Sequence, residues 1–134
     1  MKYYPRLNVY KASNVTADLN KMTAYSWGWW KFLAEIDGKI VFNTFNYSIS
    51  TAEHQWKVEC LLKNQGIDID IEIESPDGLQ RLESAIEHYE SKIKELETLI
   101  KKPRTHVLKN IDRQCQIDRY ASKIKTVKKL LKKI

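Results

Sequence analysis

The sequence predicts an α+β fold in one domain, residues 1–134, in which a small antiparallel sheet precedes two long helices. Three observations predict it. Residues 25–48 place large apolar side chains on both sides of an Asp-Gly pair, residues 67–74 alternate isoleucine with acid, and apolar residues after position 76 recur every three or four positions. The first pattern is typical of a strand hairpin, the second of a strand and the third of paired helices.

The predicted hairpin turns at Asp37-Gly38, because these residues can supply the positive φ angles of a two-residue turn. This turn pairs Ile36 with Lys39 and fixes the register of both strands. One face is then predicted to pack in the core and carries Trp30, Phe32, Ala34, Val41, Phe45 and Tyr47. The opposite face carries Trp27, Trp29, Lys31, Glu35, Thr44 and Asn46.

Before the hairpin, residues 7–10 could add a short N-terminal edge strand, since Pro5 is tolerated beside one. After it, Ser50 and Glu53 have the spacing of a capping box and predict a helix over 51–65. Gly66 would end that helix in the left-handed conformation.

The alternating segment 67–74 is expected to turn its isoleucines to the core and its acids to solvent or a basic partner. Ser75 and Pro76 then suit the N-cap and first position of a helix over 76–101. Pro103 should end that helix, and a second one is predicted over 105–133.

The domain therefore divides into a sheet-plus-helix part, residues 1–75, and a helical hairpin, residues 76–134. Helices of this length reach about 35 to 40 Å at 1.5 Å per residue. Such a hairpin extends beyond a small sheet and would leave part of its apolar seam exposed in a monomer. We expect it to pack against at least one other copy, as a dimer or a larger homo-oligomer.

Composition narrows the class of protein. The chain has 43% hydrophobic and 30% charged residues, as ordinary globular domains do. It contains neither a run of apolar residues long enough to span a bilayer nor a signal peptide, which predicts a cytoplasmic protein. Cys60 and Cys115 fit no metal or redox spacing, so we expect reduced, buried thiols.

Catalytic and metal-binding patterns are sparse. His54, His88 and His106 lack the spacing of zinc ligands, and no phosphate-binding glycine loop or nucleophile elbow is present. Glu53 and His54 could offer an acid and a base, but capping and an exposed first turn account for both. The acidic alternation in 67–74 could chelate a hard cation, although a solvated strand face accounts for it as well. The sequence predicts no cofactor, no metal site and no enzymatic activity.

An aromatic and amide-rich group in the hairpin carries the first functional signal. Its rings could stack on a base and its amides could read ribose or base edges. The alternative is that the rings pack under the helices and the asparagines serve the sheet. The candidate ligand-binding residues here are Trp27, Trp29, Asn43 and Asn46, beside Tyr47.

Positive charge in the last segment carries the second signal. Residues 101–134 hold 12 basic and 2 acidic side chains, against 8 and 9 in residues 1–75. Lys109, Arg113 and Arg119 could clasp a phosphate. The end of the last helix could bind a polyanion or be a solvated lysine face, and carries Lys123, Lys125, Lys128, Lys129, Lys132 and Lys133.

The hairpin segments WGWWKF and VFNTFNYSISTAEHQ, followed by a helix, GIDID and two long helices, resemble small bacteriophage counter-defence proteins. Within that group the chain is similar to the Thoeris anti-defence sponge family. The resemblance implies a viral, non-enzymatic oligomer that captures cyclic ADP-ribose-type signals in the host cytoplasm and holds them intact.

On that hypothesis Trp27 or Trp29 stacks on adenine and Asn43 or Asn46 reads ribose. Arg113, with Arg119 or Lys109, then meets phosphate. A second hypothesis is an interaction protein of the anti-restriction or anti-CRISPR type, whose basic helices bind nucleic acid or an acidic host protein. A scaffold built on the helical seam is a third.

Overall fold

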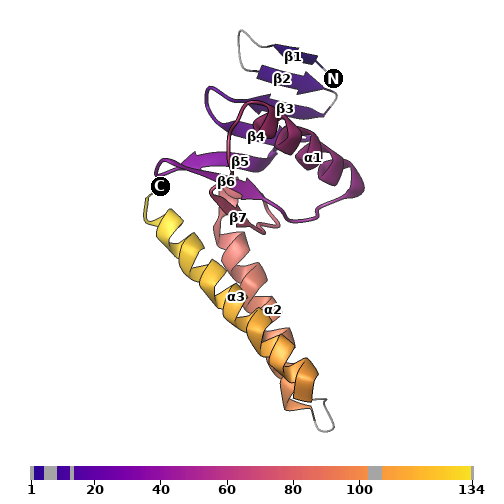
Figure 1. Ribbon diagram of the computed structural model, residues 1–134, viewed down its shortest axis with the longest axis vertical. Helices are drawn as coiled ribbons and strands as arrows, with labels where there is room; N and C mark the ends of the chain where they lie inside the picture. Colours follow the sequence, from indigo (N-terminus) through magenta and orange to yellow (C-terminus); the bar gives the residue numbers. More distant parts are fainter. Residues whose placement is uncertain (1, 5–8, 13, 103–106, 134) are drawn as a thin grey trace.

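The computed structural model describes residues 2–4, 9–12, 14–102 and 107–133, and its architecture is α+β, as predicted. The strands are β1 (Lys2–Tyr4), β2 (Val9–Ala12), β3 (Val15–Asp18), β4 (Thr23–Ser26), β5 (Trp30–Ile36), β6 (Lys39–Asn43) and β7 (Ile71–Ile73). The helices are α1 (Ile49–Asn64), the 3-10 turn η1 (Leu79–Arg81), α2 (Glu83–Lys101) and α3 (Val107–Leu131). Strands follow one another across a single sheet, α1 lies on one face, and the α2–α3 hairpin projects from the β7 side (Figure 1).

The predicted turn at Asp37-Gly38 is confirmed. Asp37 and Gly38 have φ angles of 54° and 74°, and Ile36 pairs with Lys39 as the two-residue turn requires. The sheet is mixed rather than purely antiparallel, because β7 runs parallel to β6. The reason is topological: α1 lies between these two strands in the chain and carries it back across the sheet, a connection that makes neighbouring strands parallel.

The N-terminal quarter contains more strand than predicted. The four strands β1 to β4 form an antiparallel meander that continues into β5. The edge strand expected over 7–10 overlaps β2 at Val9 and Tyr10, but β2 is not at the edge, because β1 pairs with its other side. Leu7 and Asn8 lie outside the described residues. Residues 25 and 26 belong to β4, so the segment predicted as one hairpin, 25–48, contains two turns: one between β4 and β5 and one between β5 and β6. The segment from Trp27 to Trp29 connects strands and is not part of one.

The segment 67–74 is strand only at Ile71–Ile73. Just before it, Asp70 pairs with the Ile40 backbone through both its carboxylate and its N–H, at 2.8 and 2.9 Å. At least one of the alternating acids therefore binds the backbone of β6 and does not simply face solvent.

Both predicted helix starts shift. Ser48 caps α1, since its Oγ accepts the Thr51 N–H at 3.1 Å, so the helix begins two residues before position 51. Ser75 does not cap α2. Its buried hydroxyl bonds the Gly78 carbonyl and the Ser84 hydroxyl, and a short η1 turn precedes the helix at Glu83.

The sheet packs on both faces. On one, Val58 and Leu62 of α1 join the cluster that contains Leu33 and Phe42. On the other, the hairpin helices pack on β5, β6 and β7 through a cluster that includes Ile36, Val41, Ile73, Leu82, Tyr89 and Val127. Each face therefore has its own apolar core, and the chain around Trp27 lies at the end of the sheet between them.

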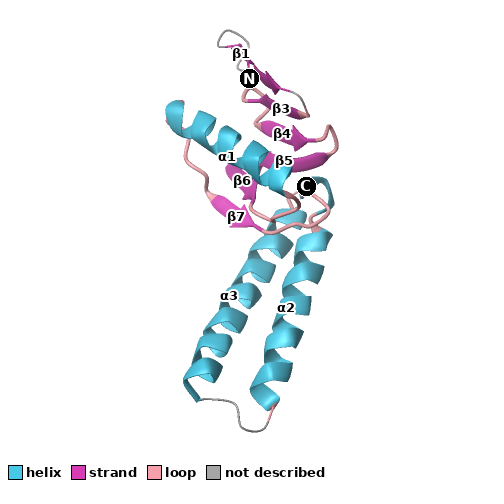
Figure 2. Ribbon diagram, turned by 90° about the vertical axis from the view of Figure 1, so that its right-hand side faces the viewer, coloured by secondary structure: helices cyan, strands magenta, loops and turns pink. Residues whose placement is uncertain are grey.

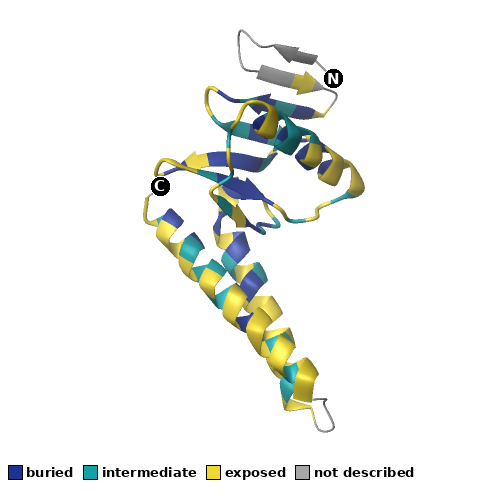
Figure 3. Ribbon diagram, viewed as in Figure 1, coloured by how far each residue is buried: buried dark blue, intermediate teal, exposed yellow. Residues whose placement is uncertain are grey.

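The two hairpin helices extend away from the sheet (Figure 2), and their exposure increases toward the tip (Figure 3). In α3 the buried residues are Ile117, Val127 and Leu130, whereas Val107, Leu108 and Ile111 near the tip are 55–70% exposed. The helix break expected at Pro103 and the start at Thr105 lie outside the described residues. Within the described ranges, no helix has the length and apolar character needed to cross a bilayer.

Candidate functional site

Three half-exposed aromatic rings gather at one end of the sheet and form what we call the aromatic cluster: Trp27, Trp29 and Tyr47. They are 44%, 49% and 47% exposed. Trp27 and Trp29 come from the β4–β5 turn and Tyr47 from the β6–α1 loop. The Trp29 and Tyr47 rings meet edge to face with centroids 5.8 Å apart.

Backbone geometry holds Trp27 outward. Its φ angle is 58°, the left-handed region that a bulky side chain rarely adopts, and its N–H donates to the Asn14 carbonyl at 2.6 Å. A conformation of this kind costs on the order of 1 kcal/mol or more and clusters at functional sites. The glycine that follows, at 77°, completes the turn.

Tyr47 was predicted in the core and is exposed instead. Its ring lies between Trp29 and the fully buried Trp30, whose centroid is 5.6 Å away. Trp30 is itself fixed, because its indole N–H donates to the Pro76 carbonyl at 2.9 Å. Tyr47 therefore rests on a fixed aromatic ring and Trp29 rests on Tyr47, which holds these two outer rings in one arrangement.

Beneath Trp27 lies a buried polar network. The His54 ring is 5.9 Å from the Trp27 ring, and its Nδ1 is 2.8 Å from the Ser26 hydroxyl, which also contacts the Thr51 hydroxyl at 3.1 Å. His54 was expected to be exposed and is 9% exposed, while Ser26 is fully buried. The buried Ser26 hydroxyl is out of reach of a substrate, so it does not serve as a nucleophile. Ser26 and His54 instead support the Trp27 ring from the interior side.

Burial lowers the pKa of the His54 imidazole below its ordinary value of 6.5; the Lys57 ammonium lowers it further and the Glu53 carboxylate opposes both. The folded protein therefore disfavours the charged ring. As pH falls below about 6.5 the unfolded chain binds this proton first, so the free energy of unfolding should decrease.

We expect His54→Asn, which keeps a polar group near the Nδ1 position but does not titrate, to reduce the loss of stability between pH 7.5 and pH 5. Urea unfolding at these two pH values measures the free energy of unfolding of each variant. His88→Asn is the matched control, since it also removes a histidine from the unfolded chain. Equal pH dependence in wild type and His54→Asn would refute the assignment.

The two candidate asparagines have different roles. Asn43 is fully buried and its amide makes three hydrogen bonds: Oδ1 accepts the N–H groups of Ser75 and Phe45 at 2.9 and 3.1 Å, and Nδ2 donates to the Ser75 carbonyl at 2.8 Å. Because it is buried, a ligand on the surface does not reach it. Asn46 is exposed, in the loop that carries Tyr47, and remains a candidate.

The basic candidates lie far from the aromatic cluster. Lys109, Arg113 and Arg119 are on the tip half of α3, and Arg113 is about 25 Å along the helix from Leu130, where α3 meets the sheet. Arg113 also donates to the Leu99 carbonyl and to the Asn110 side chain, at 3.5 and 3.2 Å. Within one chain the structure does not bring the arginines to the tryptophans (Figure 1).

Metal-binding groups do not gather in the described part of the chain: no three His, Cys, Asp or Glu side chains are close enough to hold an ion. Both cysteines are free thiols. Cys60 is partly buried and Cys115 is exposed, so the prediction of burial is wrong for Cys115.

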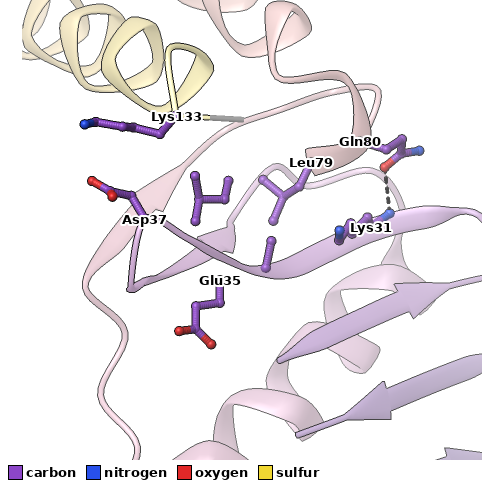
Figure 4. A pocket seen from close by; sticks show the side chains of 8 residues that line it. Lys31, Glu35, Asp37, Leu79, Gln80 and Lys133 are labelled. Atoms are coloured by element: carbon purple, nitrogen blue, oxygen red, sulfur yellow. Dashed lines mark hydrogen bonds between the residues drawn. The ribbon is translucent and has the colours of Figure 1, made fainter. Parts of the chain in front are cut away.

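A second site is a pair of hollows beside the β5–β6 turn and the end of α3, one of which extends back along β5 to Lys31. The hollow in Figure 4, about 350 Å³, has Lys133 and Asp37 at one end and Lys31 with Gln80 at the other. On the other side of Asp37 and Lys133 is a cleft of about 390 Å³.

No protein-family model, curated protein or solved structure matches the chain.

Proposed function

We propose that this protein binds a nucleotide-derived signal molecule without converting it, and removes it from solution by holding it on the aromatic cluster. The observation that carries the proposal is the presentation of three half-exposed rings, with Tyr47 and Trp29 supported by the buried Trp30 and with Trp27 in a left-handed backbone conformation above His54. The resemblance to phage counter-defence proteins supports a cyclic ADP-ribose-type ligand and a viral role in the host cytoplasm.

The chemistry of the cluster suits the base and ribose of such a ligand. Stacking of a base on an aromatic side chain contributes about 1–3 kcal/mol, and sequestration needs this affinity and no acid–base step. Trp27 and Trp29 supply the stacking faces. The exposed amide of Asn46 is the nearest candidate for a ribose hydroxyl along the loop from Tyr47.

The test is calorimetry of the purified protein with cyclic ADP-ribose isomers. We expect Trp27→Ala and Trp29→Ala each to weaken binding by about tenfold or more, the equivalent of one lost stack. Trp56→Ala is the matched control. Trp56 is 63% exposed on α1, and in the described structure it makes no ring contact with the cluster, so its loss should change affinity by less than about twofold.

Recovery of the ligand unchanged after incubation would agree with sequestration, and its turnover would contradict it. Absence of heat with every isomer at high protein concentration would reject the ligand class. Equal losses from Trp27→Ala and Trp56→Ala would reject the site.

The same proposal includes self-association through the hairpin tip. Val107, Leu108, Ile111 and Cys115 form an exposed apolar stripe on α3, in which Ile111 follows Leu108 by three residues and Val107 by four, and Cys115 follows Ile111 by four. The stripe points away from α2, because Arg113 and Tyr120 face that helix: Arg113 bonds Leu99 and the Tyr120 ring stacks on Tyr89 at 5.6 Å.

A second copy is the partner that suits this stripe, because two copies related by a two-fold axis near Ile111 cover each other's exposed apolar residues. Lys109 lies about 160° around the helix axis from Ile111 at 100° per residue, on the side away from the stripe, so it takes no part in this contact.

An interaction protein that binds nucleic acid or an acidic host protein is the second candidate. It is favoured by the exposed lysines Lys125, Lys128, Lys129, Lys132 and Lys133 toward the end of α3. Salt separates the two functions, because binding of a phosphate backbone weakens steeply as salt concentration rises and stacking on an aromatic cluster responds far less.

A further inference from the structure

The cleft between the β5–β6 turn and the end of α3 is lined by four lysines, one acid and an apolar floor, and we call it the lysine cleft. It encloses about 390 Å³ and is lined by Asp37, Lys39, Ile71, Thr126, Lys129, Leu130, Lys132 and Lys133. Three elements distant in sequence contribute to it: the hairpin turn, β7 and α3.

The charges in this cleft are unbalanced. Four ammonium groups face one carboxylate, and among the described residues none of the four forms an ion pair. The partial negative charge at the C-terminal end of α3 offsets this repulsion in part, by about 0.3–1 kcal/mol for each nearby cation. The unliganded protein therefore holds positive charges together that a bound anion would stabilise.

From this arrangement we propose that the lysine cleft binds a small ligand carrying a diphosphate or triphosphate group. The volume is within the range of small-molecule sites, about 300–1,000 Å³. Lysine ammonium groups are established phosphate ligands as point charges. Ile71 and Leu130 provide apolar surface for an organic part. The Thr126 hydroxyl also lines the cleft, but it donates to the Ser122 carbonyl at 3.2 Å, so the lysines carry the phosphate contacts.

This site is separate from the aromatic cluster. The two lie at opposite ends of β5, whose seven residues span about 20 Å. Binding at one can therefore be tested while the other is intact, and inorganic pyrophosphate, which has no base to stack, is the probe that reports on the lysine cleft alone.

Calorimetry with pyrophosphate at low salt should show binding to the wild-type protein. The double variant Lys129→Ala/Lys132→Ala should weaken it by about tenfold or more. The matched control is Lys125→Ala/Lys128→Ala, which removes the same charge from the same helix at exposed positions that do not line the cleft. We expect that control to change affinity by less than about threefold.

A third variant, Lys39→Ala, tests the contribution of the hairpin turn and should weaken pyrophosphate binding without any change in α3. Trp27→Ala should leave pyrophosphate binding unchanged, which separates this proposal from the nucleotide proposal above. Thermal unfolding of each unliganded variant confirms that it is folded.

Three results would overturn the proposal. One is the absence of pyrophosphate binding at low salt. A second is an equal loss of affinity in the two lysine double variants, which would show that the helix attracts anions along its length without a defined site. A third is binding of an oligonucleotide together with indifference to pyrophosphate, which would assign the lysines to a nucleic-acid backbone.

Discussion

Replacing Asn43 by alanine is expected to lower the free energy of unfolding by about 3–5 kcal/mol, the largest single effect we predict on stability. The side chain satisfies three backbone groups, the N–H and carbonyl of Ser75 and the N–H of Phe45, all at 2.8–3.1 Å. Asn43 is fully buried, so water cannot replace these bonds without opening the structure. Urea unfolding measures the difference.

Asn46→Ala is the matched control for this prediction. It removes the same amide three residues later, from an exposed position, and should change stability by less than about 0.5 kcal/mol. A loss below about 1.5 kcal/mol for Asn43→Ala would show that the network is not needed to hold β6 against the loop before α2.

The stability of Asn43→Asp as a function of pH tests the hydrogen bond that Nδ2 donates to the Ser75 carbonyl. Aspartate keeps the oxygen that accepts two N–H groups, but at neutral pH it turns a second oxygen toward the Ser75 carbonyl in place of a donor. Burial raises the pKa of such a carboxyl, so protonation on acidification should restore the donor and recover part of the lost stability. Asn43→Ala should show no such recovery.

The strand hairpin and the helical hairpin could be predicted from the sequence because their signals are local. An Asp-Gly pair can adopt the required φ angles by itself, and an uninterrupted apolar spacing indicates a helix whatever lies beside it. The meander of β1 to β4 was missed because its strands are only three or four residues long, too short for a clear period. Each of these strands forms by pairing with the strands beside it, and its own residues do not specify that pairing.

The candidate site could be predicted only in part, because only some of its features have a local signal in the sequence. Trp27 and Trp29 were expected at an exposed surface, and they are exposed, but in a turn: the Trp27-Gly28 pair is a turn signal that strand alternation masked. Asn43 and Asn46 cannot be told apart by residue type. Their difference arises from Ser75, which is 32 residues away from Asn43 in the chain.

The placement of the arginines shows a further limit of sequence patterns. Apolar spacing predicts that α2 and α3 pair, but it does not predict that Lys109 and Arg113 lie at the free tip while the aromatic cluster lies beyond the base. That separation follows from the point at which the hairpin meets the sheet, which is set by contacts of Ile73, Leu82 and Val127. It leaves Lys109 and Arg113 too far from the aromatic cluster of the same chain to share a ligand with it.

Ile111→Glu is expected to convert the protein from a dimer to a monomer. The wild-type protein should sediment at micromolar concentration with twice the 15.8 kDa mass of the chain. Ile111 lies at the proposed two-fold axis, so the substitution places two carboxylates against each other in an apolar contact. Burial of such unpaired charges costs about 3 kcal/mol or more, which is a hundredfold or greater loss of affinity between copies.

Gln116→Glu is the control, because it adds the same charge at an exposed position of the same helix, about 140° around the helix axis from Ile111 at 100° per residue, and should leave the dimer intact. A wild-type monomer at micromolar concentration would reject the contact. Equal loss of the dimer in Gln116→Glu and in Ile111→Glu would exclude the two-fold axis near Ile111.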